Sequence, residues 1–179
     1  MVYVFLANGF EDIEALAPVD LMRRAGIEVK TVGVGGSNIT TSHRVTVKTD
    51  MTINELVFGS DLEMIVLPGG MPGTLNLEND MELQHTIDYC VENDKYIGAI
   101  CAAPCILGHK GLLEGKKATC YPGFEKDLLG AEFTGEKVVQ DGKIITSRGA
   151  GACLEFGLKL VEALKGKEKS DEIADNIRY

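Results

Sequence analysis

The sequence predicts an α/β protein, a three-layer α/β/α sandwich whose central sheet is mostly parallel. Short runs of wholly apolar residues alternate along the chain with segments whose apolar residues recur at helical spacing. Such runs are typical of strands covered on both faces, and strands joined through helices pair in parallel by right-handed crossovers. The chain has 179 residues, of which 45% are hydrophobic and 25% charged, so we expect residues 1–179 to form a single domain.

The expected elements can be read in chain order. The first half predicts a buried strand at 2–6, a helix at 11–25 that bends at Pro18 and is capped by Gly26, a strand at 29–34, a half-exposed edge strand at 40–49 and a buried strand at 64–67. The second half predicts a helix at 81–93, a strand at 96–100, a helix just after residue 101, a hairpin at 138–145 with a type I′ turn at Asp141-Gly142, and a helix at 150–164 capped by Gly166. The charged residues 167–179 carry Ile173 and Ile177 as their only helical pair. Ligands of such sheets bind outside the carboxyl ends of the strands, which here carry residues 8–14, 68–70 and 101.

Composition and charge exclude several classes of function. Lys and Arg total 18 against 27 Asp and Glu, a net charge of -9, so we expect no stable nucleic-acid binding. We find no run of about 18 apolar residues and no basic leader at the start, and we therefore expect a cytoplasmic protein with no membrane segment. Five cysteines, an odd number, argue against a disulfide scaffold and predict reduced thiols.

Cys101 is the best candidate nucleophile in the sequence. It stands where the apolar run 96–100 ends and a helix-like segment begins, and Pro104 places the helix start just after it. A thiol at a helix N-terminus faces the positive end of the dipole, which can lower a cysteine pKa from about 8.5 into the range of about 3.5 to 7.5. We therefore expect Cys101 to be ionised easily.

Glu14 is the candidate partner of this thiol. Glu11 and Glu14 lie three residues apart on the first turn of the expected helix, and acids there can simply complement the helix dipole. The functional hypothesis places Glu14 against the Cys101 sulfur, where a carboxylate would raise the thiol pKa by repulsion. The useful arrangement is a protonated Glu14 that donates to the thiolate, so the two groups titrate as a pair.

Two backbone segments are candidates for an oxyanion hole. Gly69 and Gly70 can turn their N–H groups outward and, with the Ala102 N–H, can face the thiolate. The alternative is a tight turn after a strand, which Pro-Gly-Gly suits equally well.

The remaining thiols and histidines point to structural roles. Cys90 and Cys153 fall on apolar helical faces and are expected to be buried. Cys105 follows Cys101 by four residues, but the chain has no Cys-x-x-Cys and its histidines are scattered, so we expect no metal site. Cys120 is a candidate thiol near the site, which either supports the residues around Cys101 or forms a disulfide with an oxidised Cys101. His85 is expected at the surface and His109 at the end of a helix, so neither is a predicted general base.

Six short segments carry a family pattern. They are Glu11-Asp12-Ile13-Glu14, Pro18-Val19-Asp20, Arg23-Arg24-Ala25-Gly26, Leu67-Pro68-Gly69-Gly70, Ala99-Ile100-Cys101-Ala102 and Thr146-Ser147-Arg148-Gly149. Together they resemble the ThiJ/PfpI superfamily, and within it the Parkinsonism-associated deglycase subfamily often called DJ-one, over nearly the whole chain. The resemblance implies a flavodoxin-like sandwich, a homodimer and a reactive cysteine at a sharp turn beside a protonated glutamate.

The resemblance also assigns roles to single residues. It implies that Cys101 is the nucleophile, Glu14 its hydrogen-bond partner, and Gly70 and Ala102 backbone donors. Further matches are Arg44, near the site at a dimer interface, and Arg24 and Arg148 of the family motifs.

Two departures from related branches bear on mechanism. Tyr121 replaces a histidine that the best-known member of the subfamily has near its cysteine, so a mechanism that needs this imidazole is in doubt. In the protease branch a histidine directly follows the nucleophile, whereas Ala102 follows it here, which disfavours peptidase activity. Class I glutamine amidotransferases need a downstream His-x-Glu, which the sequence does not contain.

Two hypotheses of function follow from the resemblance and the thiol. The first is a cofactor-independent enzyme of glyoxalase or deglycase type, which binds a small reactive dicarbonyl or a glycated adduct as a hemithioacetal at Cys101. The second is a redox sensor or stress chaperone that responds through oxidation of Cys101 to a sulfinate. The sequence leaves both open, because both need the same activated thiol; a role in a thiamine-linked pathway is a third alternative.

Overall fold

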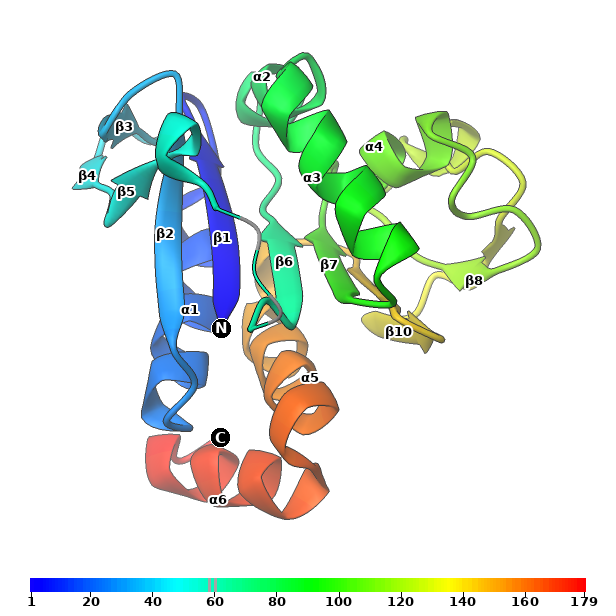
Figure 1. The fold of residues 1–179 in the computed structure, drawn as a ribbon. Helices are drawn as coiled ribbons and strands as arrows, with labels where there is room; N and C mark the ends of the chain where they lie inside the picture. Colours follow the sequence, from blue (N-terminus) through cyan, green and yellow to red (C-terminus); the bar gives the residue numbers. More distant parts are fainter. Residues whose placement is uncertain (58, 60) are drawn as a thin grey trace.

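The computed structural model describes residues 1–179 except Phe58 and Ser60. Within that part of the chain the main sheet has seven strands in the order β10-β11-β7-β6-β1-β2-β5 (Figure 1). Their bounds are β1 Val2–Ala7, β2 Val29–Val34, β5 Met51–Thr52, β6 Met64–Leu67, β7 Tyr96–Ile100, β10 Val138–Asp141 and β11 Ile144–Ser147. Neighbouring strands pair in parallel except for the antiparallel β10–β11 hairpin. The predicted mostly parallel sheet is confirmed.

Helices cover both faces of this sheet. The main helices are α1 Asp12–Arg24, α2 Gly73–Glu78, α3 Met81–Glu92, α4 Pro104–His109, α5 Cys153–Lys165 and α6 Lys167–Ile177. Figure 1 shows α3 and α4 in front of the strands and α1 and α5 behind them, with α6 below α5. The flavodoxin-like three-layer sandwich predicted from the sequence is confirmed.

Alternation along the buried strands builds two hydrophobic clusters, one on each face. In β1 every residue is buried, and Phe5 joins the cluster that includes Ile87 of α3, whereas Val4 joins the cluster that includes Phe156 of α5. We call them the α3-side cluster and the α5-side cluster. Because side chains of a strand point alternately to opposite faces, an apolar run with no polar interruption is what a sheet covered twice requires.

Most predicted elements lie where the sequence placed them. The strands at 29–34, 64–67 and 96–100 have the predicted bounds. The helix predicted at 150–164 begins with a 3-10 turn, η3 Ala150–Ala152, before α5, and Gly166 caps it as expected. The charged residues after Gly166 form α6, which buries Ile173 at 1% exposure. The remaining short elements are η1 Ile53–Glu55, β8 Lys117–Ala118, η2 Glu125–Asp127 and β9 Glu132–Phe133.

The edge strand predicted at 40–49 is wrong. The chain forms a small antiparallel hairpin there, β3 Asn38–Thr40 and β4 Thr46–Lys48, outside the main sheet. The Thr41 hydroxyl accepts hydrogen bonds from the N–H groups of His43 and Val45, which turns the chain back on itself. At the end of the main sheet next to β2, the edge strand is β5.

The predicted hairpin at 138–145 is confirmed, but its turn lies one residue later. Asp141 pairs with Ile144, so Gly142 and Lys143 form the loop. A type I′ turn needs positive φ at both loop residues, and only Gly142 has it, at 59°. Glycine at the first loop position is typical of a type II′ turn.

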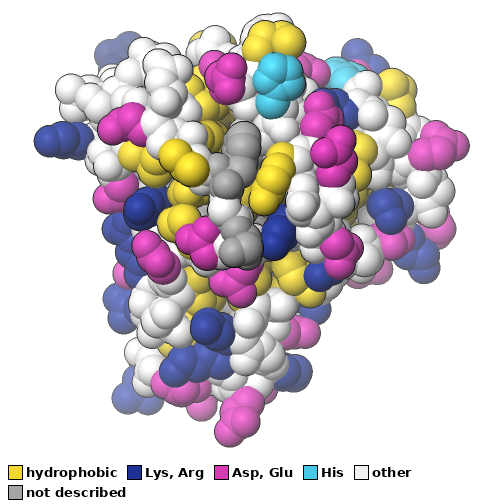
Figure 2. All heavy atoms as spheres, in the orientation of Figure 1, with side chains coloured by type: hydrophobic (Ala, Val, Ile, Leu, Met, Phe, Trp, Pro, Cys, Tyr) yellow, Lys and Arg dark blue, Asp and Glu magenta, His cyan; other side chains and the backbone are white. Residues whose placement is uncertain are grey.

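The surface carries charges of both signs. Figure 2 shows Asp and Glu side chains interspersed with Lys and Arg over the face that it draws, with no continuous basic patch on that face. None of the helices in the described part of the chain combines the length and apolarity that crossing a membrane demands.

Phe156 offers a direct test of the α5-side cluster. Its ring is fully buried and packs against the backbone of β7, where a Cβ on Gly98 would lie 3.2 Å from Phe156 Cζ. We expect Phe156→Ala to lower the free energy of unfolding by about 3 to 5 kcal/mol, because it removes buried apolar surface and leaves a cavity. Leu154→Ala, at a side chain that is 40% exposed, is the matched control and should change stability by less than about 0.5 kcal/mol in urea denaturation. Equal decreases in the free energy of unfolding of the two variants would contradict the placement of Phe156 in the α5-side cluster.

Candidate active site

The loops that follow β1 and β6 meet at one edge of the sheet. The Glu11 N–H donates to the Gly69 carbonyl oxygen over 3.0 Å. A Cβ on Gly9 would lie 2.5 Å from Pro72 Cδ and 2.7 Å from Pro72 N, so the two loops pack backbone against backbone. The carboxyl end of β7, with Cys101, lies beside them because β7 pairs with β6.

Cys101 occupies a sharp strand-to-helix turn. Its φ is +65°, a left-handed conformation that costs a residue with a side chain roughly 1 to 2 kcal/mol. Two backbone hydrogen bonds of 2.8 Å hold the turn: the Cys101 N–H donates to Ser147 O, and Cys101 O accepts from the Tyr121 N–H. Cys101 is the one cysteine among the described residues that is only partly buried. This geometry is typical of a nucleophile elbow.

Glu14 lies against this thiol. The Glu11 carboxylate caps α1 by accepting from the Glu14 N–H at 2.8 Å, which orients the first turn. The Glu14 carboxyl is only 1% exposed; its Oε2 accepts from the Gly69 N–H at 3.0 Å, and it is hydrogen-bonded to the Cys101 side chain. An acid that merely complemented the helix dipole would have no reason to be buried.

Burial changes the protonation of Glu14. Loss of solvent around the carboxyl is the main cause that raises its pKa to about 7, and the negative charge of Glu11 adds to it. Hydrogen bonds from Cys101 and the Gly69 N–H act in the opposite direction but are weaker. A large share of Glu14 is therefore protonated at neutral pH and can donate to the sulfur.

The predicted depression of the Cys101 pKa is wrong. Burial, and then the Glu14 charge, raise the pKa of the Cys101 thiol, while the Ala102 and Gly70 N–H groups lower it by less. The helix terminus cannot compensate because α4 begins only at Pro104 and a carboxyl faces the sulfur directly. Cys101 and Glu14 titrate as a coupled pair, and a thiolate forms where the thiol proton is transferred to Glu14.

The three backbone donors predicted for the oxyanion hole divide between two tasks. Hydrogen bonding from the Gly70 and Ala102 N–H groups lowers the pKa of the Cys101 thiol, whereas the Gly69 N–H donates to Glu14 at 3.0 Å. A Cβ on Gly69 would lie 2.6 Å from both Cys101 Cβ and Glu14 Oε2. Only glycine therefore fits between the cysteine and the glutamate.

The two neighbouring candidates Cys120 and Tyr121 differ in exposure and in the groups that they contact. The Tyr121 ring is 51% exposed and lies over Gly149, where a Cβ would be 3.1 Å from the ring and 3.8 Å from Glu14 Oε1. Tyr121 thus borders the site. Cys120 is 1% exposed and belongs to the α3-side cluster, whereas Cys101 packs on the α5-side cluster. The role of Cys120 beside the site stays a prediction, and its neighbour Tyr121 donates its N–H to Cys101 O at 2.8 Å.

The three candidate arginines lie at the surface. Arg24 pairs with Asp20 at 2.6 Å on α1, and Arg148 is exposed after β11. Arg44, with φ +70°, is exposed in the turn between β3 and β4. Within the described residues, no arginine is among the groups that dominate the pKa of Cys101 or Glu14.

Sequence reasoning missed two features. The Ala150 N–H is a further donor to Glu14, and only the family motif at 146–149 pointed to that region. The second feature is a group of Glu78, Cys105 and His109 side chains, whose ligand atoms lie within 4.8 Å of one another. The spacing of four between Cys105 and His109 was a signal, but the contribution of Glu78 from another helix could not be read from it.

The site and the fold agree with a known family. Residues 1–163 match the DJ-1/PfpI family. The chain belongs to the DJ-1/PfpI family.

Several DJ-1 relatives align with nearly the whole chain. Protein DJ-1 homolog A of Arabidopsis thaliana is 38% identical over 97% of this chain, and Protein dj-1beta of Drosophila melanogaster is 36% identical over 97% of it. The chain spans 45% of the Arabidopsis protein and 94% of the Drosophila protein. The glutathione-independent glyoxalase DJR-1.2 of Caenorhabditis elegans is 28% identical over 91% of this chain and 87% of its own length.

Solved structures of DJ-1 proteins share the fold. Oxidized Toxoplasma gondii DJ-1 superposes with a TM-score of 0.92 at 36% identity, over 99% of this chain and 97% of that one. Drosophila melanogaster DJ-1beta gives a TM-score of 0.92 at 34% identity, over 98% and 96% of the two chains.

The glycine between Cys101 and Glu14 can be tested in this DJ-1/PfpI protein. We expect Gly69→Ala to speed alkylation of Cys101 by iodoacetamide at neutral pH, because the added methyl group separates the thiol from the Glu14 carboxyl, whose charge and hydrogen bond raise the thiol pKa. Gly151→Ala is the matched control, since a Cβ there meets nothing within 4 Å. An unchanged alkylation rate in a folded Gly69→Ala protein would contradict the proposed contact.

The raised pKa of Glu14 predicts a pH dependence of stability. Below its ordinary pKa of 4.5 the carboxyl is protonated in the folded and unfolded chain alike; as pH rises towards about 7, only the unfolded chain releases the proton. Wild type should therefore lose up to roughly 3 kcal/mol relative to Glu14→Gln between about pH 4.5 and pH 8. The measurement is urea denaturation of both proteins across that range. Parallel stability curves would show that Glu14 titrates normally.

Proposed function

We propose that this protein is a cofactor-independent enzyme of glyoxalase or deglycase type, which acts on reactive dicarbonyls or their early adducts through Cys101. The observation that carries the proposal is the Glu14 carboxyl, 1% exposed and hydrogen-bonded to the Cys101 side chain. A general acid of pKa about 7 suits proton transfer near neutral pH. The relationship to a C. elegans protein named as a glutathione-independent glyoxalase supports the same chemistry.

The first step follows from the contacts around the sulfur. With the thiol proton on Glu14, the Cys101 thiolate attacks the aldehyde carbon, and the carbonyl π electrons move to oxygen. The Gly70 and Ala102 N–H groups, which lower the pKa of the Cys101 thiol, stabilise the developing oxyanion. Glu14 gives up its proton to that oxygen, and the product is a hemithioacetal.

The same carboxyl serves the later steps. As a carboxylate, Glu14 can take the proton from the hemithioacetal carbon to give an enediol; return of this proton to the neighbouring carbon, with transfer of the hydroxyl proton to the neighbouring oxygen, gives a thioester of a hydroxy acid. Water then cleaves the thioester and restores the Cys101 thiol. For methylglyoxal the sum is addition of one water to give lactate, which needs no external oxidant or reductant.

A redox sensor is the second candidate. Cys101 is only partly buried and would react with peroxide, and the Gly70 and Ala102 N–H groups and protonated Glu14 can hydrogen-bond to sulfinate oxygens. Each of two peroxide molecules transfers one oxygen to the sulfur and leaves as water. The oxidized state named for the T. gondii structure supports this as a property of related proteins.

We extend the proposal to assembly and setting. Residues 1–179 are proposed to act as one domain in a cytoplasmic homodimer, as the sequence led us to expect. The exposed turn with Arg44 and Val45, the latter 51% exposed, offers apolar and cationic surface for a second copy.

Lactate production from methylglyoxal separates the two candidates. We expect wild type to turn over, Cys101→Ala to lose activity completely and Glu14→Gln to lose 10²- to 10⁴-fold in kcat, since one residue is the nucleophile and the other the proton carrier. Cys153→Ala, which removes a thiol that is only 4% exposed, is the matched control and should retain activity. A chelator in every assay keeps metal ions out of the comparison.

Two outcomes would reject the enzyme. Turnover retained in Cys101→Ala would show that the chemistry does not use this thiol. Negligible wild-type turnover, together with peroxide oxidation confined to Cys101 in mass spectrometry, would support the redox sensor instead.

A further inference from the structure

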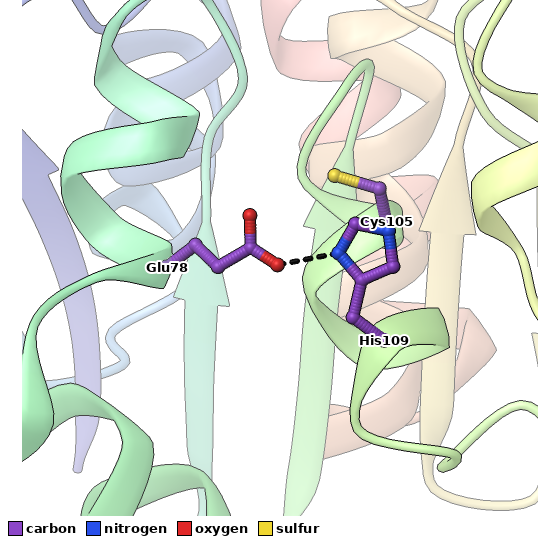
Figure 3. A group of neighbouring side chains, drawn as sticks. All are labelled: Glu78, Cys105 and His109. Atoms are coloured by element: carbon purple, nitrogen blue, oxygen red, sulfur yellow. Dashed lines mark hydrogen bonds and ion pairs between the residues drawn. The ribbon is translucent and has the colours of Figure 1, made fainter.

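A second group of reactive side chains lies between α2 and α4, away from the Cys101 thiol. Glu78 is the last residue of α2, and Cys105 and His109 lie four apart on α4, which places them on one helical face. Figure 3 shows the Glu78 carboxyl and the Cys105 sulfur directed to the same side of the His109 ring. The Glu78 Oε1 to His109 Nδ1 distance is 2.5 Å, and one ligand atom from each residue lies within 4.8 Å of the other two.

A fourth side chain completes the group. Asp127 Oδ1 lies 3.6 Å from Nε2 of His109, the ring nitrogen that does not contact Glu78. Asp127 is the last residue of η2. The backbone of η2 packs directly on Gly108 of α4, where any Cβ would collide with the Asp127 carbonyl oxygen. Carboxylates therefore contact both ring nitrogens of His109.

We propose that Glu78, Cys105 and His109 form a binding site for a divalent cation of the Zn²⁺ class, with Asp127 as the carboxylate that orients the His109 ring. A thiolate, an imidazole and a carboxylate are the three ligand types that Zn²⁺ takes from proteins. A ligating histidine commonly donates its second ring N–H to a carboxylate, which is the place that Asp127 occupies. The hard cations Ca²⁺ and Mg²⁺ prefer oxygen ligands and do not fit this set.

The spacing and the charges suit such an ion. Tetrahedral ligands at zinc-ligand distances of about 2.0 to 2.3 Å lie roughly 3.3 to 3.8 Å apart. The Glu78–His109 contact of 2.5 Å would widen to admit the ion, and all three ligand atoms already lie within 4.8 Å of one another. Glu78 places a carboxylate beside the Cys105 sulfur, and Asp127 places a second carboxylate beside the His109 ring. Binding moves the thiol proton, and any proton on the ligating His109 nitrogen, to solvent. The thiolate and Glu78 then balance the two positive charges of the ion.

This site is separate from the one at Cys101. Cys105 belongs to the α3-side cluster, whereas Cys101 packs on the α5-side cluster, so the two residues pack against different hydrophobic clusters. A bound ion would link α2 to α4. These two helices directly follow the loop that contains Gly70 and the turn that contains Cys101.

Cobalt and zinc titrations test the proposal in the full chain. The parent protein carries Cys101→Ser, so that the first thiol cannot contribute. We expect one Co²⁺ per chain with a thiolate-to-cobalt charge-transfer band in the near ultraviolet, and a Zn²⁺ addition that displaces the cobalt and raises the melting temperature. In this background Cys105→Ser should abolish the band, Glu78→Gln and His109→Gln should weaken Zn²⁺ binding at least tenfold, and Asp127→Asn should weaken it about 10- to 100-fold.

Matched controls decide between a site and nonspecific binding. Cys153→Ser removes a cysteine with the same 4% exposure as Cys105, and His85→Gln removes an exposed histidine on α3; neither should alter binding. A band that survives in Cys105→Ser, equal losses in Cys153→Ser, or the absence of a saturable isotherm would overturn the proposal and leave a His109–Glu78 ion pair. Should Cys105→Ser fail to fold, the Glu78→Gln and His109→Gln variants still decide, because these two side chains are partly exposed.

Discussion

The site depends on one buried contact, the Glu14 carboxyl against the Cys101 thiol. The charged form of each group is disfavoured, because burial raises the pKa of both and two adjacent negative charges repel each other. The two groups are therefore not both anionic near neutral pH. The Gly69 N–H and the Ala150 N–H stabilise charge on Glu14, whereas the Gly70 and Ala102 N–H groups stabilise charge on sulfur. Backbone donors on both sides allow the proton to move between the two groups without leaving either anion unsolvated.

The sheet topology is what brings this pair together. β1, β6 and β7 are neighbours at the centre of a parallel sheet, so the chain leaves all three at the same edge. The first turn of α1, which carries Glu14, therefore lies beside the end of β7. Gly69 places no side chain between Glu14 and Cys101. The unfavourable φ of Cys101 persists because backbone groups of Ser147 and Tyr121 hold the residue from two other segments.

Much of this architecture could be predicted from local patterns. Uninterrupted apolar runs identified β1, β6 and β7, since a sheet covered on both faces buries the side chains on both sides of a strand. The edge strand at 40–49 was not predictable from alternation alone, because the Thr41 side chain competes for backbone N–H groups and turns the chain. The hairpin turn was displaced for a related reason: Asp141 is engaged in strand pairing, which leaves Gly142 to supply the positive φ.

The candidate site was predictable only where a residue's role is local. The elbow at Cys101 followed from a strand running into a helix that contains Pro104. The raised pKa of the Cys101 thiol could not be predicted from the local sequence. It depends on Glu14, 87 positions earlier in the chain, and on how deeply both groups are buried. The same limit applies to the choice between Gly69 and Gly70, whose N–H groups point to different partners although the residues are adjacent.

Two thiols four residues apart illustrate how the sheet separates chemistries. Cys101 precedes α4 and its sulfur meets Glu14 beside the α5-side cluster, whereas Cys105 lies within α4 and belongs to the α3-side cluster, near Glu78 and His109. Both sulfurs lie beside a carboxyl, but the surrounding donors differ. At Cys101 two backbone N–H groups can stabilise an anion at the sulfur, which suits a nucleophile. At Cys105 the acidic neighbours Glu78 and Asp127 make the thiolate costly until a cation compensates it, which suits a metal ligand and disfavours attack on carbonyl carbon.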